Sequence, residues 1–221
     1  MMDFLGDSLP DATPIHDAFF KTAVPRYIGD AERRNLLINA AEKVFLAKGY
    51  VATTMADIAS AASMSKKTIY QIFTSKAELF DALMVERLAA LPSAATASTK
   101  PPAEALRGML MDFGRALLSP RQISLTRLIL ANIASVPQAN ANVTRRCLDI
   151  RRSLSDWLGT QVAAGAFQIA DLGHTSEMLF SLTFATFQTD LLLALRETPS
   201  EEELAEQVDR SLAIFLREFA S

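Results

Sequence analysis

The sequence predicts an all-α protein of about nine helices, and three observations support this fold class. Apolar residues recur at intervals of three or four along most of the chain after residue 30. Polar and apolar residues nowhere alternate with period two for long enough to indicate a sheet. Prolines, glycines and capping residues divide the chain into segments of helical length. We therefore expect a small N-terminal helical domain followed by a larger helical domain.

Residues 1–29 precede the helical pattern. They contain Pro10, Pro14 and Pro25 and show no sustained periodicity, so we interpret them as a flexible arm. The segment lacks the basic-then-apolar order of a secretory signal.

The first helix is expected to begin at Asp30 and to end at Gly49, since glycine commonly terminates helices. One of its faces is apolar at helical spacing. This face consists of Leu37, Ala40, Ala41, Val44 and Phe45.

Two short helices follow, joined by a tight turn at Ser63 and Met64. Thr54 is placed to cap the first of them, with Asp57 three residues later, where a carboxylate meets unpaired backbone amides. Ser65 is placed to cap the second. The inward-facing residues of the second short helix are Ile69, Ile72 and Phe73.

A further helix is predicted from the capping-box pattern Ser75-Lys76-Ala77-Glu78, and it runs to about Ala90. We assign residues 30–90 to one DNA-binding domain built on three helices, with a helix-turn-helix at about 54–73.

The second short helix has the properties of a helix that enters the major groove of DNA. Its first turn gathers hydroxyls and cations beside free backbone amides, which can donate to phosphates and base edges. One turn later, a glutamine can pair with adenine and a tyrosine can meet a phosphate or a thymine methyl group. A lysine that opens the next helix is placed to clamp a phosphate. These candidate contacts are Ser65, Lys66, Lys67, Thr68, Tyr70, Gln71 and Lys76.

An ordinary solvated helix start is the alternative interpretation of Ser65–Thr68. The outward position of Tyr70 and the shortness of both helices favour DNA binding. Residues 26–90 hold nine basic and seven acidic side chains, a net charge of +2, whereas the whole chain carries −3. A small local surplus suits a sequence-specific binder better than a general nucleic-acid coat.

The same residues resemble the N-terminal domain of the TetR (tetracycline-repressor) family over about 50 positions. The matching text begins as Ala40-Ala41-x-x-Val44-Phe45-x-x-x-Gly49-Tyr50-x-x-Thr53-Thr54-Met55-x-x-Ile58-Ala59. It continues as Ala62-x-Met64-Ser65-Lys66-x-Thr68-Ile69-Tyr70-x-x-Phe73-x-Ser75-Lys76-x-x-Leu79-Phe80. The remainder is similar to the AcrR- and AefR-like members of the family in its length, its helical character and the run Leu128-Ile129-Leu130-Ala131 before Pro137.

The resemblance implies a homodimeric transcription factor that binds a palindromic operator in double-stranded DNA. It implies a repressor that an unknown small-molecule effector releases from the operator. Carried over by position, it adds Thr54 to the candidate DNA contacts. The family usually has glycine where this chain has Ser63, so we expect slight strain or altered geometry in that turn.

Residues 91–221 are expected to form the ligand-sensing and dimerisation domain. A connector rich in alanine, serine and threonine spans Pro92–Pro102. A second capping box joins Ser200 and Glu203. The predicted helices are 103–118, 121–135, 138–165, 172–196 and 200–219.

The last two predicted helices are candidates for a dimer interface. The helix at 172–196 is apolar nearly all round, so a partner subunit would cover its second face. The helix at 200–219 carries a stripe at steps of three and four. The candidate interface residues are Phe180, Phe187, Leu191, Leu204, Val208, Phe215 and Phe219. An intramolecular core is the alternative interpretation.

A ligand pocket between helices is a further hypothesis. Its candidate lining residues are Met109, Phe113, Leu117, Trp157, Phe167, Met178, Phe184 and Gln188. Core packing is the alternative for each apolar member, because methionine and aromatic residues at helical spacing are common in cores.

Other classes of protein find little support in the sequence. One cysteine, Cys147, leaves no intramolecular disulfide and no multi-cysteine metal site, and neither histidine has a metal-ligand neighbour at i+4. We expect no cofactor, no metal and no catalytic residue. The uncharged run Met178–Thr189 is far shorter than the roughly 20 residues of a membrane helix. We expect a cytoplasmic protein; the rival interpretations are a small helical enzyme and an interaction scaffold with a non-functional helix-turn-helix.

Overall fold

The computed structural model describes residues 29–89, 100–132 and 137–220. Within these ranges the chain forms nine helices and no strand, which confirms the predicted fold class. The predicted arm lies outside them, apart from Gly29, and so does most of the predicted connector. The helices are α1 (Asp30–Lys48), α2 (Met55–Ala61), α3 (Lys66–Ile72), α4 (Lys76–Ala89), α5 (Pro102–Leu117), α6 (Pro120–Asn132), α7 (Pro137–Ala163), α8 (Leu172–Leu192) and α9 (Glu201–Phe219).

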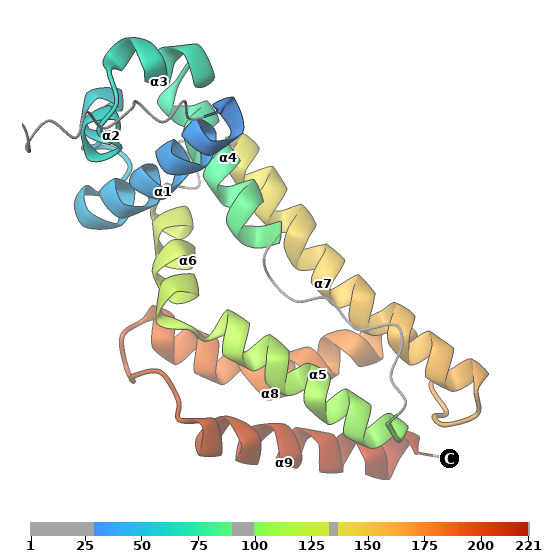
Figure 1. The fold of residues 1–221 in the computed structure, drawn as a ribbon. Helices are drawn as coiled ribbons and strands as arrows, with labels where there is room; N and C mark the ends of the chain where they lie inside the picture. Colours follow the sequence, from blue (N-terminus) through green and yellow to red (C-terminus); the bar gives the residue numbers. More distant parts are fainter. Residues whose placement is uncertain (1–28, 90–99, 133–136, 221) are drawn as a thin grey trace, which may run out of the picture.

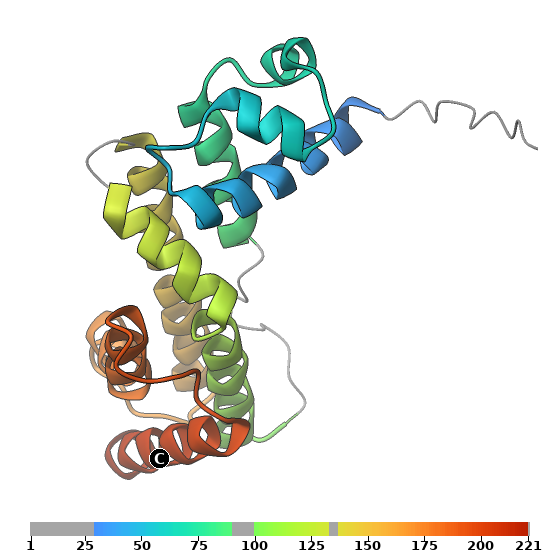
Figure 2. The same cartoon turned by 90° about the vertical axis from the view of Figure 1, so that its left-hand side faces the viewer.

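The short helices α2 and α3 lie at one end of the molecule and α9 lies at the other (Figure 1). The helices α6 and α7 run between these ends, as the turned view also shows (Figure 2). The helix-turn-helix is thus presented away from the C-terminal helices. None of the helices in the described ranges is long and apolar enough to cross a membrane.

The N-terminal core forms where the apolar stripe of α1 meets α2, α3 and α4. Leu37, Ala41 and Phe45 are fully buried, as the spacing predicted. The rings of Phe45 and Phe80 meet edge to face with centroids 5.3 Å apart, a geometry that aromatic pairs prefer. This packing holds the three helices that precede α4 in one rigid unit.

Helix α6 completes the same core, although it follows the predicted domain boundary at residue 90. Leu125, Leu128 and Ile129 are buried among the N-terminal side chains. At the edge of this contact, Glu42 accepts hydrogen bonds from Arg121 on α6, at 2.5 and 2.6 Å, and from Arg87 on α4, at 2.8 Å. The packing therefore crosses the predicted boundary, because α6 packs against α1 and α7 packs along α4.

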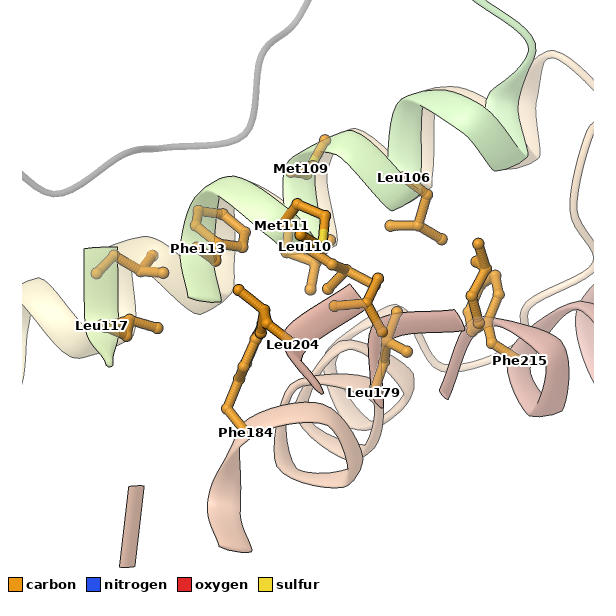
Figure 3. Close-up of a cluster of buried hydrophobic side chains, with 14 of the residues drawn as sticks. Leu106, Met109, Leu110, Met111, Phe113, Leu117, Leu179, Phe184, Leu204 and Phe215 are labelled. Atoms are coloured by element: carbon orange, nitrogen blue, oxygen red, sulfur yellow. The ribbon is translucent and has the colours of Figure 1, made fainter. Parts of the chain in front are cut away.

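The C-terminal core lies between α5, α7, α8 and α9. Leu106, Leu110 and Phe113 of α5 are buried above Leu179 and Phe184 (Figure 3). The stripe of α9 that begins with Leu204 closes this core from the other side. The close approach of α5 to α9 depends on a glycine: a Cβ on Gly114 would lie 2.6 Å from a methyl carbon of Leu204.

Helix α8 ends four residues earlier than predicted. It stops at Leu192, and Ala194 has a φ of +57°, which leaves the right-handed helical region. The guanidinium of Arg127 on α6 donates to the backbone carbonyls of Leu191 and Leu192. These contacts supply partners to the last carbonyls of α8, which have none within the helix.

Candidate DNA-binding surface

The start of α2 is fixed by a complete capping box. The hydroxyl of Thr54 accepts from the Asp57 amide at 3.2 Å, and the Asp57 carboxylate accepts from the Thr54 amide at 2.9 Å. Lys48 of α1 also donates to Asp57, at 2.9 Å. Hydrogen bonds from Lys48 and then from Thr54 lower the pKa of Asp57 to about 2. The predicted cap is confirmed, and it ties α2 to the end of α1.

The turn between α2 and α3 carries the strain that the sequence predicted. Ser63 has a φ of +55°, in the left-handed region that costs a residue with a Cβ more than glycine. The Ser63 amide donates to the Ser60 carbonyl at 3.0 Å and the Met64 amide donates to the Ala59 carbonyl at 2.8 Å. These hydrogen bonds close the turn without glycine.

Helix α3 turns one face to the core and the other to solvent. Ser65 caps it by accepting from the Thr68 amide at 3.0 Å, as predicted. Ile69 and Phe73 are fully buried and hold the helix against α1 and α2. Tyr70 is 53% exposed. The other candidate contacts on and before this helix are exposed, except the half-buried Thr68: Thr54, Ser65, Lys66, Lys67 and Gln71.

Lys76 is a correction to the predicted set. Its ammonium is directed to the loop before α2, where it donates to three backbone carbonyls. A lysine has three N–H donors, so none is left for a phosphate in this arrangement. The partners lie 23 to 26 residues earlier in the chain, which explains why the local pattern pointed to a phosphate contact.

Arg33 and Arg34, near the start of α1, were missed by the sequence analysis. Together with Thr68 and Gln71 of α3 they line an open groove of about 580 Å³. The Arg34 guanidinium lies 4.7 Å from the centre of the Phe73 ring, which fixes it beside the end of α3. The sequence feature that could have indicated them is the pair of adjacent arginines near the start of a predicted helix. Arg34 extends the positive surface of α3 toward α1, whereas Arg33 pairs with Asp30 of the same groove at 3.4 Å.

The residues predicted to line an effector pocket lie mainly in the C-terminal core. Most of them pack against one another in the C-terminal core, and Met109, Phe113 and Phe184 are labelled there (Figure 3). Met178 is instead 37% exposed, and Gln188 is half-buried. The structure supports core packing for Met109, Phe113, Leu117, Trp157, Phe167 and Phe184, and their role in binding an effector stays a prediction.

The predicted dimer interface is corrected for its buried members. They face inward, because α5 and α7 of the same chain pack against α8 and α9, whereas an interface role for the other members stays a prediction. Phe180, Phe187 and Phe219 are partly buried against the edge of this core. The fully packed members are Leu191, Leu204, Val208 and Phe215.

Two family models match this chain, one in its N-terminal part and one in its C-terminal part. Residues 37–83 match the model of the bacterial regulatory proteins of the tetR family. Residues 104–221, more than half of the chain, match the C-terminal domain of AefR-like transcriptional repressors. The chain belongs to the TetR family. It is a DNA-binding transcriptional regulator.

Some curated relatives match only part of this chain. The HTH-type transcriptional regulator YhgD of Bacillus subtilis is 39% identical over 70 residues, which are 32% of this chain and 37% of YhgD. The match thus spans little more than a third of that relative.

Solved TetR-family structures match over nearly the whole chain. The flavonoid-responsive regulator FrrA is 25% identical with a TM-score of 0.72, and the match covers 86% of this chain and 98% of FrrA. A TetR-family regulator from Mesorhizobium loti has a TM-score of 0.75 at 22% identity, covering 87% of this chain and 98% of that one. At 22% identity, the similarity to the Mesorhizobium loti protein shows a shared fold alone.

Proposed function

We propose that this TetR-family protein is a homodimeric repressor that binds a palindromic operator and leaves it when a small molecule binds. The exposed, rigidly supported first turn of α3 is the observation that carries the DNA-binding part of the proposal. Ile69 and Phe73 anchor the helix, while Lys66 and Lys67 face solvent beside free helix amides. A binder of genomic DNA would act in the cytoplasm of a bacterial cell.

Selection of bound sequences from random duplex DNA tests this function. We expect a palindrome whose half-sites lie about one helical turn, roughly 34–36 Å, apart, as a two-fold dimer requires. The selected duplex should give a gel shift that weakens steeply with salt, because binding releases counterions. Enrichment of no sequence, together with no shift at low salt, would leave the scaffold or enzyme interpretation.

The outward face of α8 and α9 supports a homodimer through other residues than those predicted. Met178 and Leu182 on α8 and Ile214 on α9 are 37%, 39% and 45% exposed. The two helices are linked at this face, since the Gln207 side chain donates to the Leu182 carbonyl at 2.9 Å. A second copy of the chain would cover these side chains in a four-helix contact.

The dimer is tested by Leu182→Glu in analytical ultracentrifugation. The buried carboxylate should shift the protein to a monomer and reduce operator affinity at least tenfold, on the order of 1.4 kcal/mol. Leu46→Glu, on the surface of α1, is the matched control, since Leu46 is 40% exposed. A parent protein that sediments as a monomer at micromolar concentration would refute the dimer.

The effector part of the proposal rests on the family and on the similarity to FrrA, whose name states a response to flavonoids. Release from DNA requires that the effector bind one conformation of the protein better than the other. A thermal-shift screen of small aromatic compounds, followed by gel shifts with each hit, tests this. A compound that stabilises the protein and weakens operator binding is expected; stabilising compounds without effect on DNA would argue against release.

A further inference from the structure

We propose that Lys76 is a positioning residue of the DNA-binding surface, which holds the loop before α2 in place and does not contact a phosphate. The proposal rests on the proposed DNA-binding function of α3. It assigns the lysine to the loop formed by residues 49–54, which leads from α1 to the cap of α2.

The contacts of Lys76 use its whole hydrogen-bonding capacity. Its Nζ lies 2.7 Å from the carbonyl oxygen of Tyr50, 2.7 Å from that of Thr53 and 3.2 Å from that of Val51. The ammonium also lies 4.5 Å from the centre of the Tyr50 ring, where the ring face attracts a cation. A phosphate would have to take a donor from one of these carbonyls.

The loop needs such a donor because its path is irregular. Gly49 has a φ of +78°, and the loop turns between two buried side chains, Tyr50 and Thr53. Backbone carbonyls that leave a helix and turn inward must find partners, or they lose hydrogen bonds to water. The Tyr50 ring is already held by Phe45 and Phe80, so the ammonium joins the loop to an ordered part of the core.

This arrangement connects α4 to the start of α2. Lys76 is the first residue of α4, and Thr54, the cap of α2, directly follows the last carbonyl that Lys76 holds. Thr54 is exposed on the surface that carries α3. Loss of the ammonium would release the loop and shift Thr54 and α2 relative to α4.

The geometry favours lysine over arginine. Three carbonyls converge on one nitrogen, which suits a tetrahedral ammonium with three donors. A planar guanidinium spreads its donors in a fork and requires more space beside the Tyr50 ring. A phosphate, in contrast, accepts lysine and arginine alike. Arginine at this position therefore distinguishes the two roles.

The experiment compares Lys76→Met, Lys76→Arg and the matched control Lys67→Met. The probe is a duplex recovered by selection from random DNA, and its affinity is measured between 50 and 200 mM salt at a temperature where every variant is folded. Lys76→Met and Lys76→Arg should each bind roughly tenfold more weakly than the parent, with the parent's salt slope. Lys67→Met should reduce the slope by about 0.9 if that exposed lysine meets a phosphate.

Two outcomes would overturn the proposal. Parent-like binding by Lys76→Arg, with a slope lowered by about 0.9 in Lys76→Met, would assign Lys76 to a phosphate. Parent-like binding by Lys76→Met with a lower melting temperature would leave only a structural role.

Hydrogen exchange in the free protein tests the loop contact without DNA. Lys76→Met should speed exchange at the amide of Thr53, whose partner is the Tyr50 carbonyl at 3.3 Å. Unchanged exchange would refute the contact. A parent that shows no salt-sensitive DNA binding would refute the proposed function instead, and the exchange result would still decide what Lys76 does.

Discussion

At the scale of single residues, Ser63 is the position where the turn of the helix-turn-helix departs from ideal chemistry. Its φ of +55° places a Cβ in the left-handed region. We predict that Ser63→Gly raises the free energy of unfolding by up to about 1 kcal/mol, because glycine relieves the steric cost. Ala194→Gly, at a φ of +57° and away from α3, is the matched control in urea unfolding. A loss of stability in Ser63→Gly alone would show that the serine side chain stabilises the turn.

Tyr70 is the most exposed apolar side chain of α3, and folding alone does not explain its position. We predict that Tyr70→Ala lowers affinity for the selected operator by about 1–3 kcal/mol, as the loss of a base-edge or phosphate contact would. Because the side chain is 53% exposed, the melting temperature should change little. Tyr70→Phe separates the hydroxyl from the ring. Equal operator affinity in the parent, Tyr70→Ala and Tyr70→Phe would show that Tyr70 does not contact DNA.

Asp57 makes the cap of α2 sensitive to acid. Its pKa is lowered from 3.8 to about 2, mainly by the hydrogen bond from Lys48 and then by those from Thr54. A lowered pKa stabilises the folded state above pH 3.8, and this stabilisation is lost as the pH falls from 3.8 toward 2. We predict that Asp57→Asn melts below the parent at pH 7 and that the difference shrinks as the pH approaches 2. A difference that stays constant across this range would contradict the carboxylate's role.

At the scale of elements, the contact between α5 and α9 depends on Gly114. A Cβ there would lie 2.6 and 2.9 Å from the two methyl carbons of Leu204, which is itself 3% exposed and packed in the C-terminal core. We predict that Gly114→Ala destabilises the protein by about 1–3 kcal/mol in urea unfolding, through overpacking. Gly108→Ala on the same helix meets no atom within 4 Å and should be neutral or stabilising. Equal effects of the two changes would refute the close approach.

Helix α6 packs into the N-terminal core through three apolar side chains, and two of its arginines contact other helices. Arg121 contacts Glu42 of α1, whereas Arg127 contacts the end of α8. One short helix thus joins the helices of the DNA-binding surface to a helix of the C-terminal core. A change in the position of α8 has a direct physical route to α1.

At the scale of the whole molecule, Glu42 links three helices from both parts of the chain. Burial by itself raises the pKa of Glu42, but the hydrogen bonds from Arg121 and Arg87 outweigh it and leave the pKa below its ordinary value. We predict that Glu42→Ala costs up to about 3 kcal/mol, because it removes the carboxylate that Arg87 and Arg121 share and leaves the half-buried Arg87 with Glu86 as its ion-pair partner. Arg121→Ala should cost about 1 kcal/mol or less, since the Arg121 side chain is 59% exposed. Urea unfolding measures the loss of stability in each variant. Equal losses in Glu42→Ala and Arg121→Ala would contradict the prediction that Glu42 matters more.

Short-range features of the fold were predictable from sequence. The caps at Thr54, Ser65 and Ser200 each join residues three positions apart, so neighbouring residue types determine them. The strained turn at Ser63 was predictable for the same reason. The capping box at Ser75 was only partly correct, because Glu78 accepts from Thr74 and not from the Ser75 amide.

The tertiary structure alone decided which surface each apolar helix face packs against. The stripe at Leu204, Val208 and Phe215 has the same spacing whether α5 or a partner subunit covers it. Likewise, a lysine at a helix start has the same sequence whether carbonyls 23 residues away or a phosphate accept its protons. The sequence by itself determined the helices, their caps and the outward chemistry of α3. The partners of buried faces and of Lys76 depended on segments distant in the chain, because close packing and hydrogen-bond pairing are settled only when those segments meet.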